Sequence, residues 1–284
     1  MNHTLQNPKS GRFSFRKLIV DVILTVFGIL MILPLIMLTA NAFKTPAELL
    51  AWPPRLIPQS PTLDNFSSVI TETPLLIWMG NSLAFAAIST VAIVLTSSIT
   101  GYVLAKFRFP GVNLIFFGVL ATAIVPFEVY MIPLYLGVRQ LGLLNSLGGL
   151  LAGYLVMSFG IFLVRQYAIS SIPDELMEAA RMDGAGEWWI FFRIVLPLMR
   201  GPIGTLTVLA FFQAWTTFAW PMVVNTARDK YVLEVVLALF QTGFTVDLGR
   251  LSAAAALSLI PSVIFFGAMR RNFVKGVAAS GMKE

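Results

Sequence analysis

The chain contains no cysteine and a single histidine, His3, among its 284 residues. Disulfide bonds, thiol-based metal or redox sites and sites built from several histidines are therefore excluded. Charged residues make up only 12% of the chain, about half the share that soluble domains use. The sequence has no G-x4-G-K-[ST] segment for binding the phosphates of ATP. It also shows no recognisable set of acid, base and nucleophile, so it predicts no enzyme, no catalytic residue and no metal site.

What the chain has in excess is apolar sequence. Hydrophobic residues make up 57% of it, and its mean hydropathy is +0.81. A helix crosses a bilayer with about 20 predominantly apolar residues. Six such segments predict an all-α integral membrane protein with six transmembrane helices. These segments cover residues 18–38, 78–104, 114–136, 147–164, 203–224 and 252–269.

The first apolar segment also has features of a signal peptide. Basic residues precede it, and it ends near Ala40-Asn41-Ala42, a small-x-small pattern. Its apolar run of about 21 residues is nevertheless longer than the 7–15 residues of a signal peptide. We therefore interpret it as a retained membrane helix.

The positions of Lys and Arg predict the orientation, because cytoplasmic loops carry an excess of these residues. Fourteen of the twenty lie before the first span, after the last span, near Lys106 or in the polar loop 165–200. Both termini and this loop are therefore expected in the cytoplasm. The chain then divides into a cytoplasmic tail (1–17), a membrane domain (18–269) and a second cytoplasmic tail (270–284). The outer segment 44–77 holds six of the sixteen prolines, which predicts an extended loop.

The polar loop carries a spaced pattern. Glu178-Ala179-Ala180 is followed by Gly184, and ten residues later by Ile194-Val195-Leu196-Pro197. All seven fixed positions match the cytoplasmic E-A-A-x3-G-x9-I-x-L-P loop of ABC-importer permeases, the membrane subunits on which ATPases dock. The flanks, 172–176 and 211–225, are similar to those of the maltose-type carbohydrate permeases. The resemblance extends over residues 15–275.

This resemblance implies the type I ABC importer permease fold, in the cytoplasmic (inner) membrane of a prokaryote. The implied partners are lipid, two ATPase subunits, a second homologous permease and an extracytoplasmic solute-binding protein, with no nucleic acid. ATP and Mg would be bound by the ATPases, and no cofactor by this chain. The implied substrate is a carbohydrate or a related compound such as a glycerol phosphate, and the sequence does not choose among them.

The residues of the polar loop predict its local structure. Ser171, Pro173 and Asp174 are typical of a helix start, which predicts a helix that runs to about Met182. Gly184 suits the left-handed residue after a helix end. A second short helix is expected over 187–193, where four aromatic residues are too many for a solvated loop.

Taken alone, this loop is compatible with an amphipathic hairpin on the lipid surface. The small pair Ala179-Ala180 instead favours close contact with another protein, and Glu178 supplies an acid for a salt bridge there. The resemblance implies that Glu178 is the anchor of ATPase docking, that the two alanines form the contact floor and that Gly184 is a hinge. The other expected docking residues are Asp183, Ile194, Leu196 and Pro197.

Polar groups inside the predicted spans are candidates for a substrate path, because a charge at mid-bilayer is costly. Glu128 lies in the third span, where it is either a structural carboxylate or part of a water-filled path. The fifth span offers aromatic rings for stacking on a sugar, with hydroxyls and an amide for its polar groups. These candidates are Gln213, Trp215, Thr216, Thr217 and Trp220.

Two observations limit the sugar-binding interpretation of the fifth span. Tryptophans near a span end are often interfacial anchors, which applies to Trp220. The maltose-type pattern usually has Trp-Asn where this chain has Trp215-Thr216, so one amide is missing. Elsewhere, the Gly149-x3-Gly153 pattern and the small residues of 252–256 predict close helix packing.

Three functions remain open at this point. The favoured one is the permease subunit of an ATP-driven, binding-protein-dependent importer. An ion-coupled secondary transporter that uses Glu128, and a non-transporting membrane scaffold, are the alternatives. The secondary transporter leaves the pattern from Glu178 to Pro197 unexplained, whereas the scaffold would bind a cytoplasmic partner through the same loop.

Overall fold

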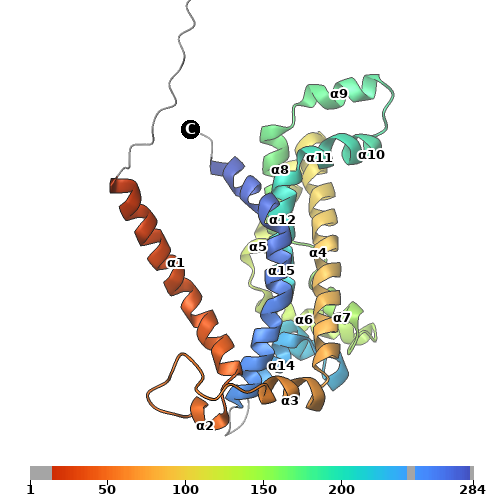
Figure 1. The fold of residues 1–284 in the computed structure, drawn as a ribbon. Helices are drawn as coiled ribbons and strands as arrows, with labels where there is room; N and C mark the ends of the chain where they lie inside the picture. The colour runs from red at the N-terminus through yellow and green to blue at the C-terminus, as the bar shows by residue number, and fades with distance from the viewer. Residues whose placement is uncertain (1–14, 242–246, 282–284) are drawn as a thin grey trace, which may run out of the picture.

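The computed structural model describes residues 15–241 and 247–281, and side chains over 17–241 and 247–270. All regular structure in those ranges is helical, which confirms the all-α part of the predicted fold class. Helices α4 (Leu75–Lys106), α12 (Arg200–Trp215) and α15 (Leu248–Gly281) lie side by side between two ends of the molecule, whereas α1 (Phe15–Ala42) lies close to them at one of these ends and diverges toward the other (Figure 1). We call these the α9 end, which carries α9 (Asp174–Met182) and α10 (Glu187–Ile190), and the α3 end, which carries α2 (Pro46–Leu49) and α3 (Asp64–Glu72).

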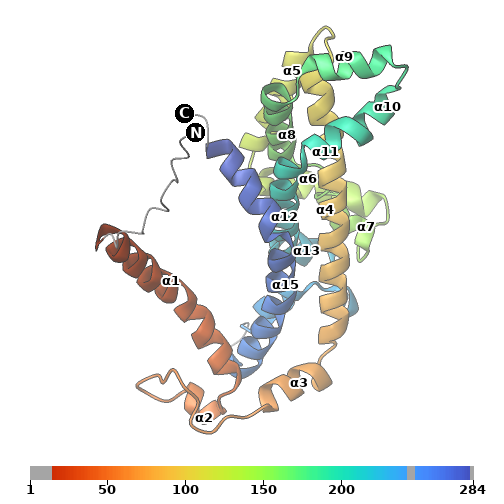
Figure 2. The same ribbon diagram turned by 45° about the horizontal axis from the view of Figure 1, so that its top comes forward.

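Three helices are individually long and apolar enough to cross a membrane. They are α1 (Phe15–Ala42), α4 (Leu75–Lys106) and α15 (Leu248–Gly281). The first, second and sixth predicted spans lie within them. At about 1.5 Å per residue, α4 is about 48 Å long and reaches from one end of the molecule to the other (Figure 2).

The third predicted span, 114–136, is broken. It consists of α5 (Val112–Ile124) and α6 (Phe127–Gln140), which meet at an angle of 99°. The break lies at Val125-Pro126, since a residue before proline is held in extended conformation and proline has no N–H for the helix. The expectation of one unbroken helix here was wrong.

The fourth and fifth predicted spans are broken as well. Residues 147–164 form α7 (Leu147–Leu151) and the first half of α8 (Ser158–Ser171). Residues 203–224 form most of α12 (Arg200–Trp215) and the short α13 (Ala219–Val224). The described residues hold three continuous candidate spans, or up to five if each of two bent pairs, α5 with α6 and residues 187–198 with α12, counts as one span.

The predicted small-residue contacts are present. A side chain at Gly149 would place its Cβ 2.3 Å from the carbonyl oxygen of Leu143. Gly153 lies against Phe127, and Ser252, Ala253 and Ala254 are buried. The small residues therefore allow backbone segments to approach where the broken spans pack together.

The segment 44–77 is less extended than its prolines predict. It contains α2, α3 and the first residues of α4. The amide of Asn65 donates to the carbonyls of Ala42 and Lys44 at 3.0 and 2.8 Å, and it holds this segment against the end of α1. At the same end lie the short helix η2 (Arg228–Lys230) and α14 (Leu233–Leu239).

Candidate functional site

Helices α9 and α10 form a hairpin that projects at the α9 end (Figure 1). Helix α9 begins at Asp174 and ends at Met182, as predicted. The predicted cap is wrong, because Ser171 ends α8 and its hydroxyl contacts that of Ser170, while Pro173 precedes the first turn of α9. The second helix begins at Glu187 as expected. It continues through a π-helical turn (Phe191–Val195) into α11 (Leu196–Leu198).

The turn between the two helices depends on Gly184. Its φ is +81°, in the left-handed region that glycine adopts without strain. The amide of Gly184 donates to the carbonyl of Arg181 at 3.0 Å, and that of Ala185 donates to Ala180 at 2.9 Å. The predicted left-handed residue is confirmed. An added Cβ would meet nothing within 4 Å, so the glycine is required by its backbone angle and not by lack of space.

The first turn of α9 is fastened to the last residue of α4. The Nζ atom of Lys106 donates to Asp174 Oδ1 at 2.7 Å and to the carbonyl of Ile172 at 2.6 Å. The Lys106 side chain is only 5% exposed, so the ion pair is shielded on one side. The hydrogen bond from Lys106 holds the pKa of Asp174 below its usual value.

The other end of α9 is fastened across the turn. Arg181 Nε donates to Glu187 Oε1 at 2.7 Å, and its Nη2 donates to Oε2 at 3.3 Å. This bidentate pair lowers the pKa of Glu187 and raises that of Arg181. The hydroxyl of Tyr102, on α4, lies 3.5 Å from Glu187 Oε2 and 3.7 Å from the sulfur of Met177.

These positioning residues were not found from the sequence. Lys106 served only as a charge for the orientation, and Tyr102 as part of an apolar span. The available signal was the pair of opposite charges, Arg181 and Glu187, on either side of the glycine-containing turn. Their contact depends on how tightly that turn closes.

The hairpin has a buried and an exposed side. Met177, Ala180, Ile190 and Phe191 are buried in a core that includes Tyr102. Ala179 and Glu178 are exposed. The two alanines therefore differ, since Ala179 faces outward whereas Ala180 packs mainly against its own chain.

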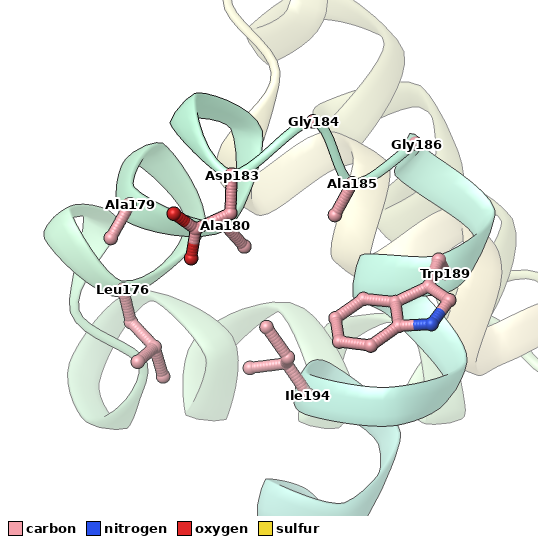
Figure 3. Close-up of a pocket in the computed structure, with 9 residues that line it drawn as sticks. All are labelled: Leu176, Ala179, Ala180, Asp183, Gly184, Ala185, Gly186, Trp189 and Ile194. Atoms are coloured by element: carbon pink, nitrogen blue, oxygen red, sulfur yellow. The ribbon is translucent and has the colours of Figure 1, made fainter.

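A concavity of about 600 Å³ lies between α9 and the helices after the turn. Figure 3 shows Asp183, Leu176, Ile194 and Trp189 around the same hollow. Five of the eight expected docking residues line it: Ala179, Ala180, Asp183, Gly184 and Ile194. Glu178 lies outside it on α9, and Leu196 and Pro197 are half-buried in α11.

Three acidic side chains of this hairpin have no partner within the described residues. Glu175, Glu178 and Asp183 are exposed, and none of these carboxylates makes a hydrogen bond or an ion pair with another described side chain. The remaining charges near the turn neutralise one another. The hairpin therefore presents free negative charge beside an apolar hollow.

The candidates for a substrate path separate into exposed and packed residues. Glu128 lies in the first turn of α6, directly after the break, and it is exposed, as are Gln213 and Thr216. Trp215 is buried with its ring parallel to that of Phe211, at 5.7 Å.

Thr217 and Trp220 make internal contacts. The Thr217 hydroxyl lies 2.5 Å from that of Tyr154. Trp220 is fully buried, and its Nε1 donates to the carbonyls of Gly149 and Leu150 at 3.2 and 3.0 Å. Its indole therefore joins the two broken spans and has no free face for a sugar in this conformation.

Comparison with known proteins assigns the family. A family model described as "Binding-protein-dependent transport system inner membrane component" matches residues 97–279. An arabinooligosaccharide transport permease of Halalkalibacterium halodurans is 36% identical over 255 residues, which are 89% of this chain and 91% of the relative. A lactose transport permease of Rhizobium radiobacter is 30% identical over 260 residues, 91% and 93% of the two chains. An sn-glycerol-3-phosphate transport permease of Yersinia pestis is 32% identical over 267 residues, 91% and 95%.

A solved ABC transporter contains a chain with the same fold. A bacterial ABC transporter involved in the import of the acidic polysaccharide alginate contains a chain that superposes with a TM-score of 0.76, at 24% identity, over 92% of this chain and 99% of that one. The family model and the relatives, together with this shared fold, define a helical membrane permease of ABC importers. The chain belongs to the family of binding-protein-dependent transport system inner membrane components. It is a multi-pass permease of the bacterial inner membrane, and the ATPase is a separate subunit.

Proposed function

We propose that this permease imports a sugar or an oligosaccharide, that it docks an ATPase through α9, and that it alternates access with a second permease. The substrate class is supported by relatives named for arabinooligosaccharide and lactose transport. The observation that carries the docking proposal is the exposed, unpartnered Glu178 on a helix whose two ends are fastened to the bundle. A fixed helix with a free acid is suited to receive a basic residue of a partner.

The docking surface consists of α9 and the concavity beside it. Glu178 is the anchor, Ala179 gives close approach, and Asp183 adds a second carboxylate at the hollow. Gly184 sets the turn that brings Ile194 to the opposite wall, and Leu196 and Pro197 form the half-buried start of α11, which follows. We expect two ATPases in the assembly, one for each permease, with ATP and Mg bound by the ATPases.

The excess of Lys and Arg supports a cytoplasmic location for the α9 end, on the side of the ATPase, and for both termini. We expect six crossings, in which the broken segments 114–136, 147–164 and 203–224 each count as one. A broken span is tolerated where its freed backbone groups find partners inside the protein. The carbonyls that accept from Trp220 are such a case. The α3 end then meets the extracytoplasmic solute-binding protein.

We further propose that Glu128, Gln213 and Thr216 face the substrate path, because they are exposed. Trp215, Thr217 and Trp220 would support the wall behind them through their internal contacts. An ion-coupled transporter using Glu128 is disfavoured, since it has no use for a docking surface.

The test is purification of the tagged permease from its native membrane, followed by transport in vesicles. Recovery of an ATPase and a second permease, with sugar uptake that requires ATP and the binding protein, is the expected result. Uptake driven by a proton gradient alone would support the secondary transporter. Recovery of this chain alone, with no flux, would leave the scaffold.

A further inference from the structure

Helix α4 is joined by side-chain hydrogen bonds to a different surface at each of its ends. At the α9 end, Lys106 binds Asp174 and the carbonyl of Ile172, and Tyr102 lies against Glu187 and Met177. These contacts hold the helix on which the proposed function places the ATPase.

At the α3 end, three residues of the first two turns of α4 hold the segment 228–233. Trp78 Nε1 donates to the carbonyl of Arg228 at 2.6 Å. Asn81 Nδ2 donates to the carbonyls of Asp229 and Tyr231, both at 2.9 Å. The hydroxyl of Ser82 accepts from the amide of Leu233 at 2.7 Å. A stretch with little regular structure of its own is thereby attached to α4.

Between its ends, α4 has no break and no proline. Its α9-end half packs closely on α8, the helix that leads into α9. A Cβ added at Gly101 would lie 2.7 Å from Val164 Cγ1, and one at Gly160 would lie 2.5 Å from Ser97 Oγ. Backbones this close do not slide past one another without a clash, so α4 and α8 form one rigid unit.

The backbone alone would let α9 swing. The extended residues Ile172 and Pro173 precede it, and the turn at Gly184 follows it. The bonds from Lys106 and Tyr102, together with the burial of Met177, remove this freedom. A displacement of α9 is therefore passed to α4.

We propose that α4 transmits movement between the ATPase and the outer face of this permease. ATP-driven movement of α9 reaches the segment 228–233 through α4, and docking of the solute-binding protein near this segment reaches the ATPase by the same route. The inference rests on the proposed docking at α9. It assigns Lys106, Tyr102, Asn81 and Ser82 as positioning residues that touch neither nucleotide nor solute.

The first test uses the whole complex in proteoliposomes and measures how strongly the binding protein stimulates ATP hydrolysis. Lys106→Met removes the ion pair at the α9 end, and Asn81→Ala with Ser82→Ala removes three of the four hydrogen bonds at the α3 end. Arg108→Met and Thr71→Ala are the matched controls, since Arg108 is exposed without a hydrogen bond or ion pair to described residues and Thr71 bonds only within its own helix. Each variant at an end of α4 is expected to lower the stimulation by about 2- to 30-fold, and the controls are expected to leave it unchanged.

If both ends of α4 lie on one route, combining the variants gives a second test. Once the contacts at one end are removed, removing those at the other end should have no further effect. The combined variant should therefore lose no more of the stimulation than the more impaired single variant. Losses that multiply would show two independent routes and overturn the proposal. Lys106→Arg, which keeps the charge, should retain most of the stimulation.

The absence of cysteine allows a direct test of movement. Lys106→Cys with Asp174→Cys, bridged by a short bis-maleimide, joins α4 to α9 covalently. If α9 travels with α4, the bridged complex keeps ATP-driven uptake and regains binding-protein stimulation. If α9 has to swing against α4, bridging stops uptake while each single-cysteine variant, treated alike, continues. Absence of ATP-dependent uptake in the unmodified complex would instead refute the proposed function itself.

Discussion

Replacement of Glu178 tests the docking surface most directly. The structure places this carboxylate on the exposed side of α9, without a partner in the described residues. Its removal therefore breaks no described internal contact, and the free energy of unfolding should change by no more than about 0.5 kcal/mol. A large effect on transport would therefore have to come from the loss of a contact between Glu178 and a partner protein.

The expected magnitude follows from that reasoning. Truncating one member of a desolvated charge pair across an interface costs about 2–5 kcal/mol, which weakens association about 30- to 5,000-fold. Glu178→Lys adds repulsion toward a basic residue of the ATPase. We expect it to abolish ATP-driven uptake while the permease still inserts in the membrane.

The matched control is Glu175→Lys, one turn earlier on the same helix. Glu175 is also exposed and makes no hydrogen bond or ion pair with the described residues. Both variants change the net charge equally, so only the position differs. The assay is co-purification of the ATPase at a series of salt concentrations, with uptake measured on the same membranes. Equal behaviour of the two variants, or normal uptake by Glu178→Lys, would refute Glu178 as the anchor.

Four further outcomes are expected. Gly184→Val forces a branched side chain to a φ of +81°, at a cost of about 1–2 kcal/mol or more; ATPase co-purification should fall, and an unaffected complex would contradict this. Trp220→Phe removes the donor to two carbonyls and should destabilise the permease by about 1–3 kcal/mol in thermal unfolding, while Trp52→Phe, at an exposed ring, should not. Gln213→Ala and Thr216→Ala should raise KM for uptake without lowering the melting temperature; unchanged transport would remove them from the path. Lys106 lowers the pKa of Asp174, so the pair stabilises the hairpin at pH values above the ordinary aspartate pKa of about 3.9. This stabilisation is lost as the pH falls through the lower pKa that Asp174 has in the folded protein. Tryptophan fluorescence of the hairpin should show the loss, and Lys106→Met should abolish the pH dependence.

The local structure of the α9–α10 hairpin was largely predictable because its signals are local. A proline and two acids mark the start of α9, and a glycine with the left-handed conformation follows its end. The spacing of the seven fixed positions is the signal that indicates an ATPase as the partner. The fastening of α9 was not predictable, since Lys106 and Asp174 are 68 residues apart in the sequence and meet only because α4 and α8 pack together.

The breaks in three of the predicted spans were missed for a different reason. Mean hydropathy measures composition, and a broken apolar segment has the same composition as a continuous helix. Pro126 was visible as a local signal for one break. The gap between α12 and α13, residues 216–218, is followed by Trp220, whose indole bonds to α7 from 70 residues away, a contact that no local pattern shows.

Exposure divides the polar residues of the broken spans into two groups with different requirements. Thr217 and Trp220 have internal partners, so lipid is an acceptable neighbour for the atoms around them. Glu128 and Gln213 are exposed and have no hydrogen-bond partner in the described part of the chain. Hydrocarbon does not satisfy a carboxylate or an amide, because the unpaired polar group costs several kcal/mol there. At the depth of the hydrocarbon these two side chains would require water or another polypeptide beside them, which the proposed path between two permeases would provide.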